Sequence, residues 1–194
     1  MQTYDTSVNQ SQLPSIFETL LVPLHAEQKR RLFLIDSEDY SSVIRKVTEY
    51  FTEIGFVPPT NYIERGVYSL KQYYAVALLD PANAHAVSAP VDPFWHSHIL
   101  HSEQYMSFCE MVVGEYMHHR PLDHSKTLHL DAVRRLYSYT LDVLPQLFSI
   151  VDEVFWPQGL SDAAIICWHK GNQGIYTEVQ PYRLFEPTER GVGY

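Results

Sequence analysis

Histidine is concentrated in one short part of the chain, where five of the ten histidines lie between Pro90 and Pro121. Imidazole is the neutral nitrogen ligand that suits zinc, iron, copper and nickel in proteins. Asp92 stands four residues before the first of these histidines, so a carboxylate can join them on one side of a helix. The sequence therefore predicts a divalent metal site formed from the five clustered histidines: His96, His98, His101, His118 and His119.

Two ligand sets are open. The first has two histidines and one carboxylate, as non-haem iron sites do: Asp92, His96 and either His118 or His119. The second is entirely histidine: His98, His101 and either His118 or His119. Catalytic zinc also takes three protein ligands and keeps one position open. We therefore expect a divalent metal cofactor, with zinc and iron both open.

Three further side chains in this segment are candidate catalytic groups, as acid, base or redox-active thiol: Glu103, Tyr105 and Cys109. A bound metal could generate hydroxide at neutral pH or activate oxygen, so hydrolysis and oxidation are both open. Apolar burial would raise the pKa of the Cys109 thiol, which argues against its use as a nucleophile. The signatures H-E-x-x-H, G-x-S-x-G, G-x-x-x-x-G-K and G-x-G-x-x-G are absent.

The elements that must position these groups begin with a predicted helix. Asp92 is a suitable N-cap, Pro93 suits the first helical position, and Gly114 suits the stop, so we expect one helix from Asp92 to about Val113. The following histidines then fall in a loop closed by Pro121. At about 100° per residue, His96 and His98 project about 160° apart and would not share one ion on a regular helix.

The same residues carry a resemblance. The run V-D-x-x-W-H-x-H-I-L from Val91, followed by Tyr105, Phe108-Cys109, Gly114 and H-H-x-P from His118, resembles the core signature of the glycine-rich-domain-containing-protein-like family. The family is largely of unknown biochemical function, so the resemblance implies no reaction. Plant relatives carry a glycine-rich tail and are linked to stress and development, but this chain has only 8 glycines and no such tail. His101 departs from the family pattern, where Asp or Thr is frequent.

The rest of the chain predicts a mainly α fold, with about five or six helices in a single-domain bundle at residues 13–194. Apolar residues at helical spacing indicate helices at 15–33 (whole or divided at Pro23), 37–55, 60–79, 123–150 and 161–168. We expect a flexible arm at residues 1–12 and a small-residue linker at 82–90 in which His85 is exposed. Residues 175–194 are expected to form an irregular tail or to include a short strand at 175–179.

Composition limits the partners. The net charge of −9 and pI near 5.5 argue against a nucleic-acid partner, which needs a basic surface. No apolar run is long enough to span a membrane and no charged-then-apolar leader is present, so we expect no membrane partner. Two cysteines, Cys109 and Cys167, do not form a disulfide framework. These features together predict a cytoplasmic location.

Two functional hypotheses remain. In the first, the chain is a metal-dependent hydrolase or oxidase/oxygenase that acts on a small molecule or peptide. In the second, it is a non-enzymatic helical module that binds a protein partner, and its histidines are structural, with Asp92 only an N-cap. A histidine cluster that switches with pH is a third possibility, and it predicts a transition between about pH 5 and pH 7 without metal.

Overall fold

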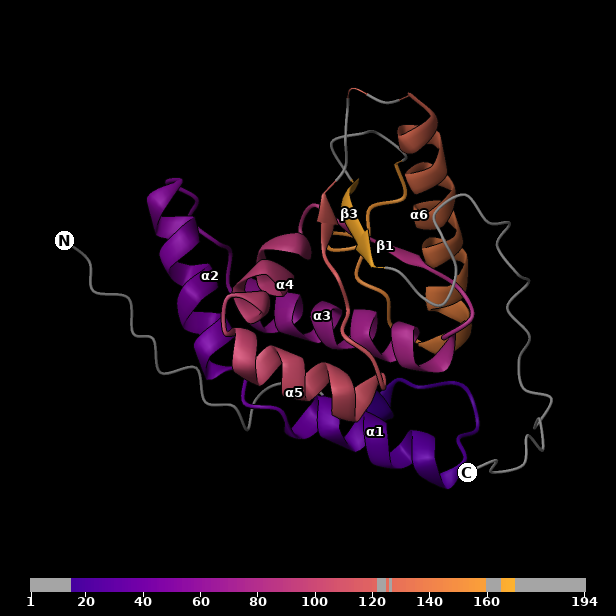
Figure 1. The fold of residues 1–194 in the computed structure, drawn as a ribbon. Coiled ribbons are helices and arrows are strands. Elements are labelled where there is room, and N and C mark those ends of the chain that lie inside the picture. The colour runs from indigo at the N-terminus through magenta and orange to yellow at the C-terminus, as the bar shows by residue number, and fades with distance from the viewer. Residues whose placement is uncertain (1–14, 122–124, 126, 160–164, 170–194) are drawn as a thin grey trace.

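The computed structural model describes residues 15–121, 125, 127–159 and 165–169. Over these residues the fold is mainly helical, as the sequence predicted, and a small sheet packs beside the helices (Figure 1). A short 3-10 turn, η2 (Ile16–Glu18), comes first. The helices are α1 (Ala26–Ser37), α2 (Ser41–Glu53), α3 (Tyr62–Leu79), α4 (Asp92–Ile99), α5 (Ser102–Val112) and α6 (Thr127–Leu147).

Helix α3 is the centre of the fold. Every residue from Gly66 to Leu79 is buried, which is the pattern of a helix covered on all sides. Figure 1 shows α1 and α5 along one side of it, α2 and α4 towards one end, and α6 with the sheet at the other. The buried Lys71 ammonium is neutralised by Asp36 of α1 at 3.0 Å, so the polar residues of α3 also tie neighbouring helices to it.

One glycine sets how closely α4 approaches α3. A Cβ placed on Gly66 would overlap the ring of Phe94, which is fully buried against it. The Phe94 ring also packs edge-on against Phe51 of α2 and Phe155, with ring centroids 6.1 and 5.9 Å apart. Gly66 therefore provides the space in which the first turn of α4 is seated.

The histidine-rich segment is not one helix, which corrects the sequence prediction. α4 ends at Ile99 and α5 begins at Ser102, because His101 has a ψ of 62° that a helix cannot continue through. Each half packs on a different partner, α4 on α2 and α5 on α1. Asp92 is the first helical residue and Val91 is the N-cap, one residue earlier than predicted.

The sheet corrects two further predictions. Residues 82–90 are not a plain linker, because β1 (His85–Ser88) lies within them and His85 is fully buried. Ile165 to Trp168 are not helical: β3 (Ile165–His169) is the middle strand, antiparallel to β1 and to β2 (Arg120–Pro121). Branched and aromatic residues favour a strand there over a short helix.

The remaining helices agree with the predictions to within a few residues. The break at Pro23 separates η2 from α1, α2 starts at Ser41 instead of Ser37, and α6 continues through Pro145 to Leu147. The predicted arm at 1–12 and the strand or tail at 175–194 lie outside the described residues. Within the described ranges, no helix combines the length and apolar character needed to cross a membrane.

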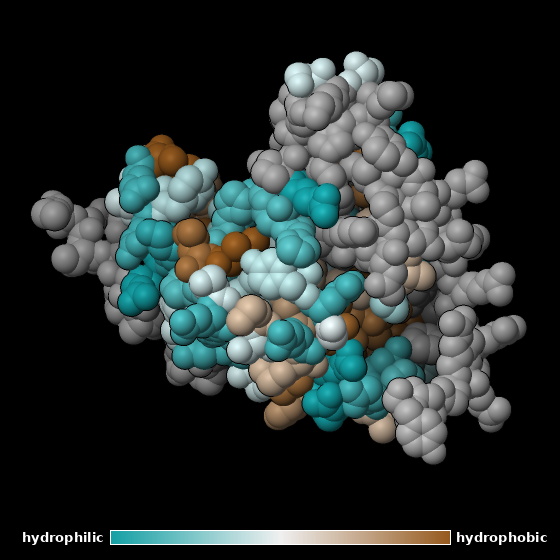
Figure 2. Space-filling model, viewed as in Figure 1, coloured by the Kyte–Doolittle hydropathy of each residue, from teal (hydrophilic) through white to brown (hydrophobic). Residues whose placement is uncertain are grey.

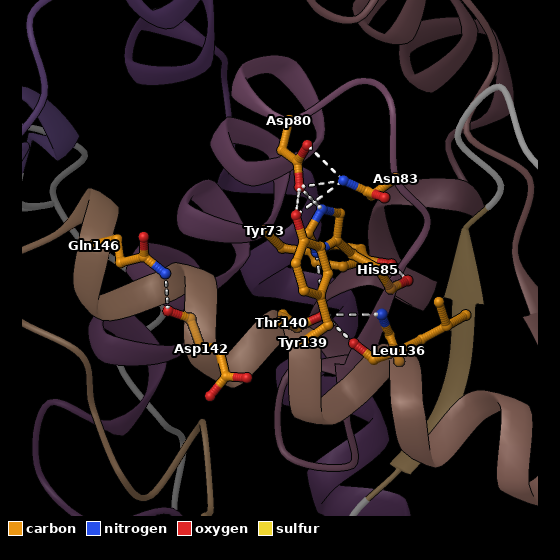
Figure 3. Close-up of polar contacts among 10 residues, drawn as sticks. Tyr73, Asp80, Asn83, His85, Leu136, Tyr139, Thr140, Asp142 and Gln146 are labelled. Carbon is orange, nitrogen blue, oxygen red and sulfur yellow. Dashed lines mark hydrogen bonds and ion pairs between the residues drawn. The ribbon is translucent and has the colours of Figure 1, made fainter. Parts of the chain in front are cut away.

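A buried polar network joins the end of α3, β1 and α6 (Figure 3). The Asp80 carboxylate accepts from the Tyr139 hydroxyl at 2.6 Å and the Asn83 amide at 2.9 Å, and it faces His85 Nε2 at 3.1 Å. His85 Nδ1 lies 3.2 Å from the Thr140 hydroxyl. Burial alone would raise the pKa of Asp80, but the hydrogen bonds and charge from His85, with the other donors, outweigh it and lower that pKa.

We predict that Gly66→Ala destabilises the protein by about 1–3 kcal/mol, because the new methyl group must displace the Phe94 ring from a packed site. Urea unfolding measures this. Gly159→Ala is the matched control, since a Cβ there meets nothing within 4 Å, and it should change the free energy of unfolding by less than about 0.5 kcal/mol. Equal stabilities of the two variants would show that the α3–α4 contact is not tight.

We predict that Asp80→Asn lowers the free energy of unfolding at about pH 7. The variant should then lose less of its stability than the wild type as the pH falls into the acid range. The native pKa of Asp80 lies below its unfolded value, so its stabilisation is complete above the unfolded pKa of about 3.9 and is lost as pH falls through the native pKa. Urea unfolding at several pH values tests this. Asp142→Asn, at an exposed position on α6, should keep the wild-type slope.

Candidate metal centre

The first two candidate ligands lie on α4. Asp92 and His96 are four residues apart, so their side chains project from the same side of the first turns. The Asp92 side chain is 6% exposed, whereas that of His96 is 52% exposed. A carboxylate at the first position of a helix is stabilised by the helix dipole. The pair therefore consists of a buried acid and an imidazole that reaches the surface.

The third candidate ligand, His119, lies on the loop that returns to α4 after α5. Gly114, with φ of 93°, ends α5 in the left-handed conformation and reverses the chain. Residues 115–119 then return to α4 before β2 pairs with β3. The His119 ring packs on Trp95 with centroids 4.9 Å apart. Trp95 Nε1 donates to the Tyr105 hydroxyl, which donates to Met117 O, both at 2.8 Å, and these bonds fix the loop against α4 and α5.

Three ligand atoms converge at this point. His96 Nε2 lies 2.6 Å from His119 Nε2 and 3.8 Å from the Asp92 carboxylate, and His119 Nε2 lies 3.1 Å from that carboxylate. Ligands about 2.0–2.1 Å from a zinc ion stand about 3.3 Å apart in a tetrahedral centre. The mean of the three distances is close to that value. Asp92, His96 and His119, hereafter the triad, could therefore hold a metal ion.

Electrostatics at the triad favour metal-binding protonation states. Burial lowers the pKa of His96 and the charge of His119 lowers it further, against the opposing effect of Asp92. A lowered pKa keeps the imidazole neutral near neutral pH, and a metal binds only the neutral form. The Nε2 atoms of the two histidines face each other beside the Asp92 carboxylate. The triad thus offers His96 in the form that a metal binds, beside the Asp92 and His119 side chains.

His98 is placed elsewhere. Its side chain is fully buried, its Nδ1 lies 2.8 Å from the Tyr74 hydroxyl, and its ring packs against Tyr105 and Phe108. Its Nε2 has no hydrogen-bond partner and lies 3.9 Å from a Glu38 oxygen. Burial lowers the pKa of His98 to about 4, so this histidine is neutral. His96 and His98 therefore face opposite environments, as their helical spacing predicted.

The structure does not bring the all-histidine set together. His101 precedes α5 with Nδ1 2.9 Å from Ser97 O, and the exposed His118 packs on Tyr116 with ring centroids 4.8 Å apart. Among the residues described, the triad is the group of three with metal-ligand geometry. Of the two loop histidines that the sequence left open, the geometry selects His119.

The candidate catalytic residues lie in α5. Glu103 is exposed, whereas the Tyr105 hydroxyl is buried and used in its bonds to Trp95 and Met117. Burial raises the pKa of Tyr105 well above its usual value and that of Cys109 to about 11. Both groups are therefore protonated near neutral pH. Tyr105 supports the triad through Trp95, and a catalytic role for any of the three stays a prediction.

A hollow of about 250 Å³ opens beside the triad, between α2 and α4. Asp92 and His96 line it together with residues that sequence reasoning missed, and Figure 2 shows apolar surface in the strip between these helices. The sequence signal was a stripe of residues at positions i, i+4 and i+7 of α2, but only the packing of α4 beside α2 shows that this stripe lines a hollow. The residues of this stripe are Lys46, Tyr50 and Glu53.

Comparison with known proteins gives one finding. A family model described as UCP032817-like matches residues 60–142, which include α3, α4, α5 and all three triad residues. No curated protein and no solved structure matches the chain. The matched segment is thus the part of the chain that contains the triad and the helix on which α4 is seated.

We predict that His98→Ala lowers the free energy of unfolding by about 2–4 kcal/mol, because it leaves a cavity and deprives the buried Tyr74 hydroxyl of its partner. His96→Ala, at the exposed end of the triad, should change the stability of the metal-free protein by less than about 0.5 kcal/mol. Urea unfolding measures both. A stable His98→Ala protein that had lost metal binding would instead make His98 a ligand.

Proposed function

We propose that the chain is a metal-dependent enzyme whose zinc or iron ion is held by Asp92, His96 and His119. The observation that carries this proposal is the approach of His96 Nε2 to His119 Nε2 at 2.6 Å, next to a buried carboxylate. The two nitrogens and the carboxylate oxygen converge as the ligand atoms of one ion do, which stand about 3.3 Å apart in a tetrahedral zinc centre. Two imidazole nitrogens that point at one place are explained most simply by a shared cation.

An active role is favoured over a purely structural one. Structural zinc sites have four protein ligands, whereas the triad has three, of which Asp92 and His96 line the hollow. The bound ion would act as a Lewis acid or would bind oxygen, which supports hydrolysis or oxidation. Asp92 and His119 are held by burial and by the Trp95 ring, so the chain presents its ligands without rearrangement.

The competing hypothesis is a protein-binding module with structural histidines. It explains the buried His85 and His98 well, but it gives no reason for the convergence of His96 and His119 at a partly exposed position. The resemblance of residues 90–121 to the glycine-rich-domain-containing-protein-like family is a separate proposal, and it supplies no reaction for either hypothesis.

We predict about one equivalent of zinc or iron in untagged protein that is purified without chelators, measured by elemental mass spectrometry. Asp92→Asn, His96→Ala and His119→Ala should each weaken metal binding at least about tenfold, since each removes one of three ligands. His118→Ala is the matched control, because this neighbour of His119 is outside the triad, and it should retain the metal.

Two results would contradict the proposal. One is folded protein that neither contains metal nor takes up added zinc or Fe(II). The other is equal metal loss in the His118→Ala and His119→Ala proteins, which would indicate binding by the loop without the geometry of the triad.

A further inference from the structure

We infer that the hollow between α2 and α4 binds a small molecule with a carboxylate group, which pairs with Lys46 while the other end of the molecule reaches the metal. This inference rests on the proposed metal centre and adds the class of ligand. The hollow of about 250 Å³ has the triad residues Asp92 and His96 on one wall. Its size suits a compact metabolite better than a folded partner.

The walls of the hollow come from two helices, and the lining residues recur at helical spacing along each. Lys46, Tyr50 and Glu53 are spaced by four and three residues, so they form one stripe on α2. On α4 and its C-cap, residues four apart form the opposite wall: Asp92 with His96, Pro93 with Ser97, and His96 with the C-cap Leu100. Because α2 packs against α4, the two walls face one another, and a molecule between them would meet both.

Lys46 is the cation of the hollow. Its ammonium lies 3.0 Å from Glu49, but the two side chains are 42% and 51% exposed. Exposed pairs of this kind are weak, so an anion in the hollow can compete for Lys46 at little cost. Lys46 therefore provides a positive charge on the α2 wall of the hollow, and the triad residues Asp92 and His96 lie on the α4 wall.

The balance of charge selects a carboxylate over a phosphate. Asp92 is used by the metal, which leaves Lys46 and Glu53 as the charged groups of the other wall. Glu53 repels any anion in the hollow, but it would repel a phosphate dianion about twice as strongly as a carboxylate, and the phosphate would lack the planar guanidinium partners that suit it. A single carboxylate needs only one cation. Leu100 and Pro93 add apolar surface against which a short aliphatic chain can pack.

Matched metal-binding probes test this inference. Acetohydroxamate binds zinc and carries no second anion, whereas the monohydroxamates of succinate and glutarate add a carboxylate on chains of increasing length. Isothermal titration of the full chain, loaded with one equivalent of zinc, should show that at least one carboxylated probe binds about tenfold more tightly than acetohydroxamate.

The variants identify the cation. Lys46→Gln should reduce this preference to less than about twofold while leaving the affinity for acetohydroxamate unchanged. Arg45→Gln, which removes a charge from the adjacent exposed position outside the hollow, should keep it. No preference in the wild type, or a preference that survives Lys46→Gln, would overturn the inference while the metal centre stands. Failure of zinc to bind would overturn both, whereas bound zinc without binding of any of the three probes would overturn this inference alone.

Discussion

The geometry of the site depends on how closely two helices can approach. At Gly66 the surface of α3 has no side chain, and the Phe94 ring fills that space. Asp92 and Trp95 lie within two residues of Phe94, so the orientation of the first turn of α4 fixes both the carboxylate of the triad and the ring on which His119 rests. The convergence of the three candidate ligands near the surface therefore depends on how α3 and α4 pack in the core.

Histidine has two roles in this molecule, and its neighbours decide which. His85 and His98 are completely buried beside Asp80 and Tyr74, where each ring contributes to the packing of helices or strands. His96 and His119 instead face each other where α4 meets the returning loop. A dense histidine run therefore does not mean that every histidine is a ligand.

The sequence predicted the helical class and most helices, and it placed Asp92 and His96 on one side of a helix, because these depend on local spacing. The sequence predictions were wrong where contacts between residues far apart in the chain determine the structure. Nothing local reveals that His101 interrupts the helix, that His85 meets Asp80, or that residues 165–169 complete a sheet. The choice of His119 over His118 depends on the Trp95 ring, and the part played by Lys46 depends on the position of α2 beside α4.

The chain positions of the three ligands have a consequence for assembly. Asp92 and His96 lie one helical turn apart, whereas His119 is joined to them only through α5 and the chain reversal at Gly114. Closing a loop of this length has an entropic cost that local helix formation does not have. A cation bound by all three side chains would therefore offset part of this cost, in addition to the hydrogen bonds from Trp95 to Tyr105 and from Tyr105 to Met117 that hold the loop.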